Sequence, residues 1–268
     1  SLYLEQISYR IEGSQDVSTV KKSFDLLAER YDVLRTVFNH SAALRPLQIV
    51  LKNRENTFTY IDNRHQSEEY EIEKTLKEYK NKDIEKGFDL TKDPLMRLAV
   101  IQITDNEFEY IWTHHHILMD GWCMGILISD FLNIYQTLIH NQEINLPVSR
   151  PYSKYIQWLE RNEGLASAEF WQKYLDNYKN HINLFGSEKK EVDFNPGEHI
   201  LVIDSKDLDI LRKTASDEKT TLNTLIQSVW AILLSRCCDL DDIVFGAVVS
   251  GRPAEIPLIE TMVGLFIN

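Results

Sequence analysis

The sequence predicts a mixed α/β fold with two subdomains, and three observations support this prediction. Short apolar runs typical of strands alternate with longer segments whose apolar residues recur at helical spacing. The chain has 268 residues, of which 43% are apolar, enough for one large domain or two modest ones. Residues 180–197 are rich in Gly, Ser, Pro and charge, as domain boundaries often are. We therefore expect an N-terminal subdomain at residues 1–179 and the beginning of a second at residues 180–268.

The first part of the chain is predicted to contain several strands and helices. Residues 3–11 suit an opening strand, and Ser14 or Asp16 can cap a helix whose apolar stripe runs from Val17 to Tyr31. The further elements expected here are strands at 47–51 and 57–61, a helix at 68–86, a hairpin of strands 96–103 and 108–113, and helices at 121–140, 152–161 and 167–178.

The second part is predicted to continue the α/β pattern. We expect a strand at 199–203, helices at 207–214 and 222–237, and a buried strand at 243–249. The final run, residues 259–268, is apolar and has no polar terminator. We therefore expect the chain to be a piece of a longer protein.

Composition excludes several classes of protein. The chain has 29 Lys and Arg against 41 Asp and Glu, and this net charge of −12 disfavours nucleic-acid binding, which needs clustered positive charge. No run approaches the roughly 18 apolar residues of a membrane span, and the first residues do not resemble a signal peptide. Cys123, Cys237 and Cys238 fit neither a disulfide framework nor a zinc site. We predict a cytoplasmic location with no membrane or nucleic-acid partner.

The densest chemical signal is the run of three histidines at 114–116, followed by Asp120 and Gly121 where a strand gives way to a helix. In an extended segment His114 and His116 point to one face and His115 to the other. Three interpretations compete: structural histidines, a metal site, and a histidine that acts as a general base or positioning group. No second ligand cluster supports a metal, so we predict no bound metal and favour a histidine that acts as a general base or positioning group, with Asp120 holding the loop or forming an ion pair.

Other kinds of catalytic site find little support. There is no Gly-x-Ser-x-Gly elbow, and Cys123 is expected to be a small buried residue. No Gly-rich phosphate loop occurs, which disfavours a nucleotide-driven ligase. If the reaction is acyl transfer, the acyl group must be activated beforehand.

Three arginines are candidates for structural ion pairs. Arg30 fits a solvated helix end, where a cation is favoured by the helix dipole. Arg35 lies among apolar residues, so it should have a carboxylate partner. Arg252 follows Ser250 and Gly251 at the end of an expected strand. These residues form either a plain strand-ending turn or a functional one.

Four segments together resemble the condensation domains of nonribosomal peptide synthetases, of the kind that make tyrocidine-like peptides. The signature HHxxxDG occupies residues 115–121, and RYDVLRTVF at 30–38 is similar to the family's RHExLRTxF, with Tyr and Asp in place of His and Glu. The aromatic segments at 152–158 and 170–171 resemble the motif that follows the active-site helix. The last residues, VGLFIN at 263–268, match the start of the VGxFVNT block.

This resemblance implies a fold and a set of partners. It implies a chloramphenicol-acetyltransferase-like sandwich of two subdomains, the second incomplete here, with the active site in the cleft between them. Donor and acceptor carrier domains would deliver thioesters on phosphopantetheine arms from opposite faces, next to an adenylation domain of the same synthetase. The acceptor amine would attack the donor thioester and form a peptide bond, with no cofactor bound directly by this chain.

The resemblance also implies roles for individual residues. His116 is expected beside the attacking amine, and the Gly121 N–H beside the thioester oxygen. Asp120 is expected to form an ion pair with Arg35 or Arg252, and the sequence does not choose between them. The complete expected set is His115, His116, Asp120 and Gly121 as the catalytic group, Arg30, Arg35 and Arg252 as structural ion-pair residues, and Trp122, Trp171 and Ser250 in the substrate cleft.

Three other functions remain open at this point. An epimerisation domain shares HHxxxDG and would deprotonate the α-carbon of a carrier-bound residue, although the segments at 34–36 and 250–253 fit condensation better. A free-standing acyltransferase is a second enzyme hypothesis. A non-catalytic platform that docks carrier domains is a third, and the presence of both His116 and Asp120 argues against it. The cyclising relatives lack the paired histidines and are excluded.

Overall fold

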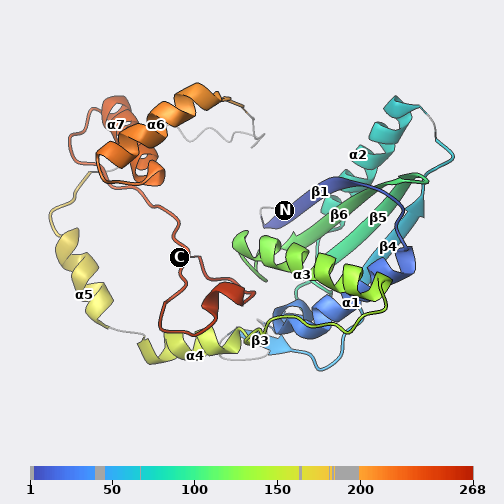
Figure 1. The fold of residues 1–268 in the computed structure, drawn as a ribbon. Helices are drawn as coiled ribbons and strands as arrows, with labels where there is room; N and C mark the ends of the chain where they lie inside the picture. The colour runs from blue at the N-terminus through green and yellow to red at the C-terminus, as the bar shows by residue number, and fades with distance from the viewer. Residues whose placement is uncertain are drawn as a thin grey trace. The chain divides into compact units, whose positions relative to one another are not determined.

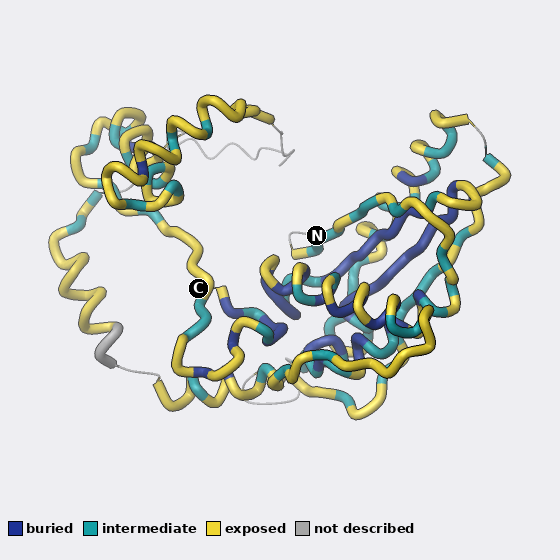
Figure 2. Tube along the Cα trace, in the orientation of Figure 1, coloured by how far each residue is buried: buried dark blue, intermediate teal, exposed yellow. Residues whose placement is uncertain are grey.

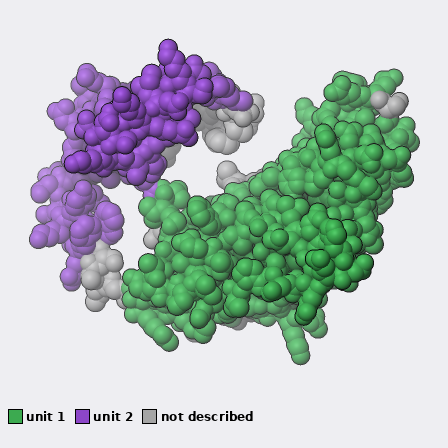
Figure 3. All heavy atoms as spheres, in the orientation of Figure 1, with its two compact units in different colours: residues 1–163, 248–268 green, residues 164–247 purple. Residues whose placement is uncertain are grey.

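The computed structural model describes residues 3–39, 46–66, 68–162, 165–180, 182, 184 and 199–267, with only the backbone described at 165–167. The chain forms two compact units (Figure 3). Unit 1 consists of Ser1–Glu163 and Val248–Asn268, and unit 2 of Gly164–Ala247.

Unit 1 contains the strands and the longest helices (Figure 1). Its elements are β1 (Leu4–Glu12), α1 (Val17–Arg30), the 3₁₀ helix η1 (Asp32–Arg35), β2 (Thr36–Asn39), β3 (Leu47–Val50), β4 (Thr57–Asp62), α2 (Glu69–Lys86), β5 (Met96–Thr104), β6 (Glu107–His115), α3 (Trp122–Ile139), α4 (Ser153–Asn162) and the 3₁₀ helix η2 (Ile259–Thr261). The elements predicted from the sequence for residues 3–161 all form, with ends shifted by a few residues.

Four of these strands form one sheet in the order β1-β6-β5-β4. β6 pairs antiparallel with both β1 and β5, and β4 pairs parallel with β5. β2 and β3 form a separate antiparallel pair. In the β1–β6 ladder Glu5 lies opposite His114, so their side chains share a face of the sheet.

The two faces of this sheet pack against different helices. Trp112 on one face contacts Phe24 of α1 and Phe131 of α3 edge-on, with ring centroids 5.6 and 5.2 Å apart. The opposite face carries Ile111, which packs in a smaller cluster with Leu76 of α2. Figure 2 shows β5 and β6 as the most continuously buried part of the sheet, since both faces are covered. The loop that carries the histidine motif therefore follows a strand that is covered on both faces.

Residues 248–267 return to unit 1 after the chain has passed through unit 2. Ile256, Met262 and Phe266 form an apolar cluster with Tyr155 of α4. This cluster fixes the last segment of the chain against the first part, although the two are distant in sequence.

Unit 2 contains three helices, α5 (Leu165–Tyr174), α6 (Ser205–Asp217) and α7 (Leu222–Cys238). Side chains cap two of them, because Asp204 accepts the Asp207 N–H at 2.8 Å and Thr221 accepts the Thr224 N–H at 3.1 Å. Most apolar side chains of α7 are exposed, among them Val229 and Leu233.

The strands predicted at 199–203 and 243–249 are wrong for this structure. Both segments are extended or irregular and pair with none of the described strands. In the first segment Val202 is 82% exposed, and in the second Val248 is 76% exposed. An apolar run favours a strand, but a strand forms only where a neighbour supplies backbone hydrogen bonds, and no described strand does so for these two segments.

The predicted subdomain boundary is not tested by these contacts. Most of the polar stretch at 180–197 lies outside the described residues. The compact units divide the chain differently, because 248–267 pack on the N-terminal part. Subdomains at 1–179 and 180–268 stay a prediction.

Among the described residues, α3 is the one helix long and apolar enough to cross a membrane by length and composition. Its buried residues include Cys123, Leu127, Phe131 and Ile134, which pack in the main core of unit 1. In this structure α3 is a core helix.

Candidate active site

The histidine motif lies between the end of β6 and the start of α3. The His116 N–H donates to the Tyr3 carbonyl at 2.8 Å, which extends the β1–β6 ladder past the strand end. The Leu118 N–H donates to the His115 carbonyl at 3.1 Å, and the Asp120 N–H to the Gly264 carbonyl at 3.2 Å. The loop is therefore fixed by its strand, by its own turn and by the last segment of the chain.

The three histidines have different surroundings. His114 is fully buried, and burial, followed by the charges of His116 and His115, lowers its pKa to about 4. It is therefore neutral at pH 7. The His115 ring stacks on Tyr3 at a centroid distance of 6.2 Å, and its Nδ1 accepts the Ile117 N–H at 3.1 Å. Burial and then the neighbouring His116 also lower the pKa of His115.

His116 is the more accessible member of the histidine pair that the sequence placed on one face. Its side chain is 28% exposed, whereas that of His114 is 0% exposed. Its Nε2 lies 3.3 Å from Oε1 of Glu5, and the other oxygen of Glu5 lies 3.2 Å from Nε2 of His114. His114 and His116 therefore meet the same carboxylate. This convergence agrees with the prediction that the two point to one face.

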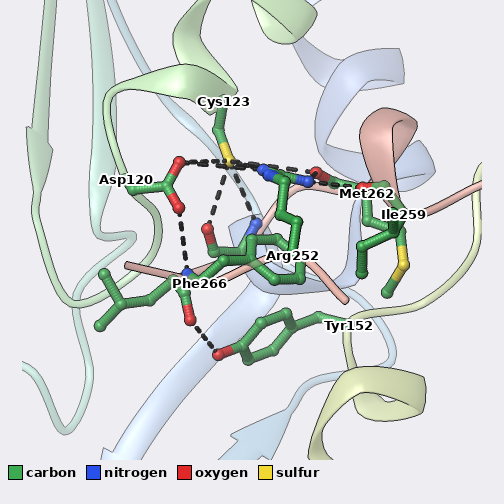
Figure 4. Close-up of polar contacts among 9 residues, drawn as sticks. Asp120, Cys123, Tyr152, Arg252, Ile259, Met262 and Phe266 are labelled. Atoms are coloured by element: carbon green, nitrogen blue, oxygen red, sulfur yellow. Dashed lines mark hydrogen bonds and ion pairs between the residues drawn. The ribbon is translucent and has the colours of Figure 1, made fainter. Parts of the chain in front are cut away.

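The Asp120 carboxylate points toward Arg252 and the backbone of Phe266 (Figure 4). Its Oδ1 lies 3.8 Å from Nη2 of Arg252, and both side chains are only 2% exposed. Its Oδ2 accepts the Phe266 N–H at 3.0 Å. Asp120 thus joins the histidine loop to residues 248–267.

Arg252 is held by more than its ion pair. Its Nη1 donates to the carbonyls of Ile259 at 2.5 Å and Met262 at 3.1 Å, and its guanidinium lies 3.9 Å from the Phe266 ring centroid. The preceding Gly251 has φ +60°, and a Cβ there would lie 1.7 Å from the Phe266 carbonyl oxygen. Glycine is required at this turn because the backbone comes so close.

Cys123 lies beside the ion pair, in the first turn of α3. Its Sγ lies 3.4 Å from Oδ1 of Asp120 and donates to the Gly264 carbonyl at 3.2 Å. Burial is the main reason why its pKa is raised to about 12, so it is a protonated thiol and not a nucleophile. The sequence predicted a small buried residue here, and the burial agrees.

Tyr152 completes the attachment of the last segment. Its hydroxyl donates to the Leu265 carbonyl at 2.5 Å, and burial raises its pKa. Its ring also fills the space at Gly264, where a Cβ would lie 2.0 Å from the Tyr152 Cδ2 atom. We call this group of contacts the latch. It consists of Asp120, Cys123, Arg252, Tyr152 and the backbone of residues 262–266.

The other two arginines pair elsewhere. Arg35 lies 2.6 Å from Asp32, the kind of carboxylate partner expected for it, and donates to the Leu51 carbonyl at 2.6 Å. Arg30 lies 2.7 Å from Asp130 of α3. Of the two arginines considered for Asp120, the structure brings Arg252 to it and not Arg35.

Within unit 1, none of the described contacts joins Trp122 or Ser250 to His116. Trp122 is 64% exposed and lines a cavity of about 560 Å³ with Gly121, Arg30 and Asp130. Ser250 is exposed. Trp171 belongs to unit 2 and is 57% exposed.

Sequence reasoning missed Glu5, and it missed Tyr152 as a latch residue. The place of Glu5 beside the histidines follows from the β1–β6 register, which cannot be read from a single sequence. The hydroxyl of Tyr152 is identified by its carbonyl partner. Among the described residues, no group of three or more His, Cys, Asp or Glu side chains could hold a metal ion.

Comparisons with known proteins agree on the family. The model of the Condensation domain family matches residues 1–268. Surfactin synthase subunit 3 of Bacillus subtilis (strain 168) is 40% identical over 269 residues, covering 100% of this chain and 21% of that protein. Tyrocidine synthase 2 of Brevibacillus parabrevis is 39% identical over 270 residues, covering 99% of this chain and 7% of that protein. The chain thus spans a minor part of these relatives.

Solved structures agree on the fold. The first condensation domain of the CDA synthetase matches with a TM-score of 0.79 at 16% identity, covering 99% of this chain and 63% of that chain. The epimerization domain from the third module of tyrocidine synthetase B matches with a TM-score of 0.77 at 19% identity, covering 99% and 60%. These matches confirm the predicted α/β fold of the condensation-domain type. With the family match over its whole length, the chain belongs to the Condensation domain family of nonribosomal peptide synthetases.

Proposed function

We propose that this chain is part of an enzyme that forms a peptide bond between two carrier-bound thioesters. The observation that carries the proposal is the partly exposed His116 at the end of a buried strand, beside a loop fixed by Asp120 and Arg252. A site of this kind presents one imidazole from a rigid support, which suits positioning and proton transfer. Membership of the condensation family supports the same reaction.

In the proposed reaction the α-amine of the acceptor attacks the thioester carbonyl carbon of the donor. A C–N bond forms, the C–S bond breaks, and the amine proton passes through His116 to the departing thiolate sulfur. An α-amine has a pKa of about 8, so an appreciable fraction is neutral at physiological pH. His116 therefore orients the amine and accepts its proton as the bond forms, and a strong base is not required beforehand.

The other predicted residues take supporting roles. The Gly121 N–H, at the N-terminus of α3, is proposed to stabilise the negative charge on the thioester oxygen, since helix N-termini favour anions. Trp122, Ser250 and Trp171 are proposed to line the path of the substrates. Asp120 and Arg252 keep the loop in place.

The proposed partners follow from the reaction. Donor and acceptor carrier domains would present the two thioesters on phosphopantetheine arms, and an adenylation domain of the same protein would activate the amino acid. We propose no direct cofactor for this chain and a cytoplasmic location, where such a synthetase would find the free amino acids that its adenylation domain activates.

The test is a mass-spectrometric assay with chiral analysis on the full-length protein that carries this chain, with loaded donor and acceptor carriers. His116→Ala should reduce carrier-bound dipeptide by at least about 100-fold, as expected for loss of a general base. His140→Ala is the matched control, because His140 is an exposed histidine at the end of α3.

Three results would contradict the proposal. Near-normal turnover in His116→Ala would remove His116 from the site. Inverted stereochemistry on one carrier without dipeptide would establish epimerisation instead. Carrier binding without any turnover that depends on His116 would indicate a docking platform.

A further inference from the structure

Glu5 of β1 contributes a carboxylate that lies between two histidines of the site. The β1–β6 register pairs Glu5 with His114, and the alternation of the strand puts His116 on the same face. One oxygen of Glu5 lies 3.2 Å from Nε2 of His114, and the other lies 3.3 Å from Nε2 of His116. A single carboxylate therefore lies within 3.3 Å of both imidazoles.

The charge of this carboxylate is directed to His116. His114 is fully buried and neutral at pH 7, because burial lowers its pKa to about 4. His116 and Glu5 are 28% and 37% exposed, so both can carry charge in partial contact with water. A positive charge on His116 would therefore face Glu5.

The carboxylate of the histidine motif itself is engaged elsewhere. Asp120 contacts Arg252 through one oxygen and the Phe266 N–H through the other. Asp120 therefore anchors the histidine loop to residues 248–267. The role that a carboxylate commonly has beside a catalytic histidine is thus taken by a residue outside the motif.

We propose that Glu5 is a positioning residue for His116: it holds the imidazole at the end of β6 and stabilises the positive charge that His116 receives from the attacking amine. This inference rests on the function proposed above. The proton moves from the amine nitrogen to His116 and then to the thiolate sulfur, while the C–N bond forms and the C–S bond breaks. Glu5 itself neither gains nor loses a proton.

The first test compares single-turnover dipeptide formation in the full-length protein. Glu5→Gln keeps the size of the side chain and removes its charge, and Glu5→Asp keeps the charge at a shorter reach. We expect Glu5→Gln to slow the reaction about tenfold at saturating acceptor carrier, because the carboxylate 3.3 Å from Nε2 of His116 no longer offsets the positive charge that develops there, and about 1.4 kcal/mol of lost stabilisation is tenfold in rate. Glu5→Asp should recover part of the rate, and KM for the carrier should not change.

The matched control is Glu12→Gln. Glu12 is an exposed glutamate at the other end of β1, opposite Glu107 and away from the histidines. It should behave as the wild type in every measurement.

The second test does not depend on turnover. Diethyl pyrocarbonate modifies the neutral imidazole, and peptide mass spectrometry resolves modification at His116. We expect His116 to react several-fold faster in Glu5→Gln, because the carboxylate oxygen that lies 3.3 Å from its Nε2 atom is gone. Glu12→Gln should react at the wild-type rate.

These measurements separate the two proposals. Wild-type turnover in Glu5→Gln, unchanged reactivity of His116, or a raised KM with an unchanged maximal rate would each overturn the role of Glu5. If the wild type itself forms no dipeptide, the proposed function fails, and the modification test alone then supports or overturns the coupling of Glu5 to His116. If Glu5→Gln does not fold, a full rate in Glu5→Asp overturns the proposal and a partial rate supports it.

Discussion

At the scale of single residues, the site separates chemical and structural roles between neighbours in the motif. His116 is accessible, His114 is buried and neutral, and Asp120 is paired inside the protein. A buried carboxylate is tolerated here because Arg252 and a backbone N–H compensate its charge. The conspicuous Asp is therefore a structural residue in this fold.

The Asp120–Arg252 pair predicts a large and non-additive stability effect. Removing either partner, by Asp120→Ala or Arg252→Met, should cost about 3–5 kcal/mol, because it leaves a buried charge without its partner. The double variant should cost less than the sum of the two. The stability of each variant can be measured by hydrogen exchange of peptides from residues 248–267 in the full-length protein. Additive effects would show that the two residues do not act as a pair.

His114 predicts a loss of stability in acid. Its folded pKa of about 4 lies below its unfolded value near 6.5, so the unfolded state binds a proton first as the pH falls. Stability should decline between about pH 6.5 and pH 4 by about 3 kcal/mol. Pulse-labelled hydrogen exchange of β6 in urea measures it. His114→Gln should show a flatter pH dependence, and an unchanged slope would contradict this assignment.

At the scale of elements, the latch depends on two places where the backbone comes unusually close to another group. Gly251 needs a left-handed turn against the Phe266 carbonyl, and Gly264 lies against the Tyr152 ring. Because both positions are glycine, residues 248–267 can pack closely against the histidine loop and Tyr152. The segment therefore acts as a structural part of the site without contributing a reacting group.

Gly251→Ala should release this segment. Both the φ of +60° and the 1.7 Å approach oppose a Cβ, so we expect a destabilisation of at least about 1–3 kcal/mol. Hydrogen exchange at residues 256–266 should become faster. Gly246→Ala is the control, because a Cβ there meets nothing within 4 Å. Equal exchange in the two variants would contradict the role of Gly251.

At the scale of the whole molecule, the two units differ in how much apolar surface they bury. Helices cover both faces of the sheet in unit 1, whereas many apolar side chains of unit 2 are exposed. In unit 2 the segment around Val202 exposes apolar side chains, as does α7, and Val248 at the edge of unit 1 is exposed as well. Contiguous exposed apolar surface in a folded protein usually marks an interface. The relatives in this family are much longer than this chain, which spans 21% of surfactin synthase subunit 3.

We predict that further protein covers these segments in the full-length protein. Val202→Asp should therefore lower its melting temperature by several degrees, although the side chain is 82% exposed here. Tyr70→Asp is the control, because Tyr70 is 73% exposed on a charged helix of unit 1 and should change little. An unaltered melting temperature in Val202→Asp would contradict this prediction.

The sequence by itself determined the α-helices of unit 1, all its strands except β2, the family and the strand-to-helix position of the histidine motif. These depend on local periodicity, capping and short motifs, which neighbouring residues encode directly. The Asp16 cap of α1 and the alternation of His114 and His116 are examples.

The tertiary structure alone decided which distant groups meet. It chose Arg252 over Arg35 for Asp120, and it brought Glu5 to His116 through the register of two strands. It also left the apolar runs at 199–203 and 243–249 unpaired with any of the described strands. In each case the outcome depends on a partner far away in the sequence, and local propensity carries no information about that partner.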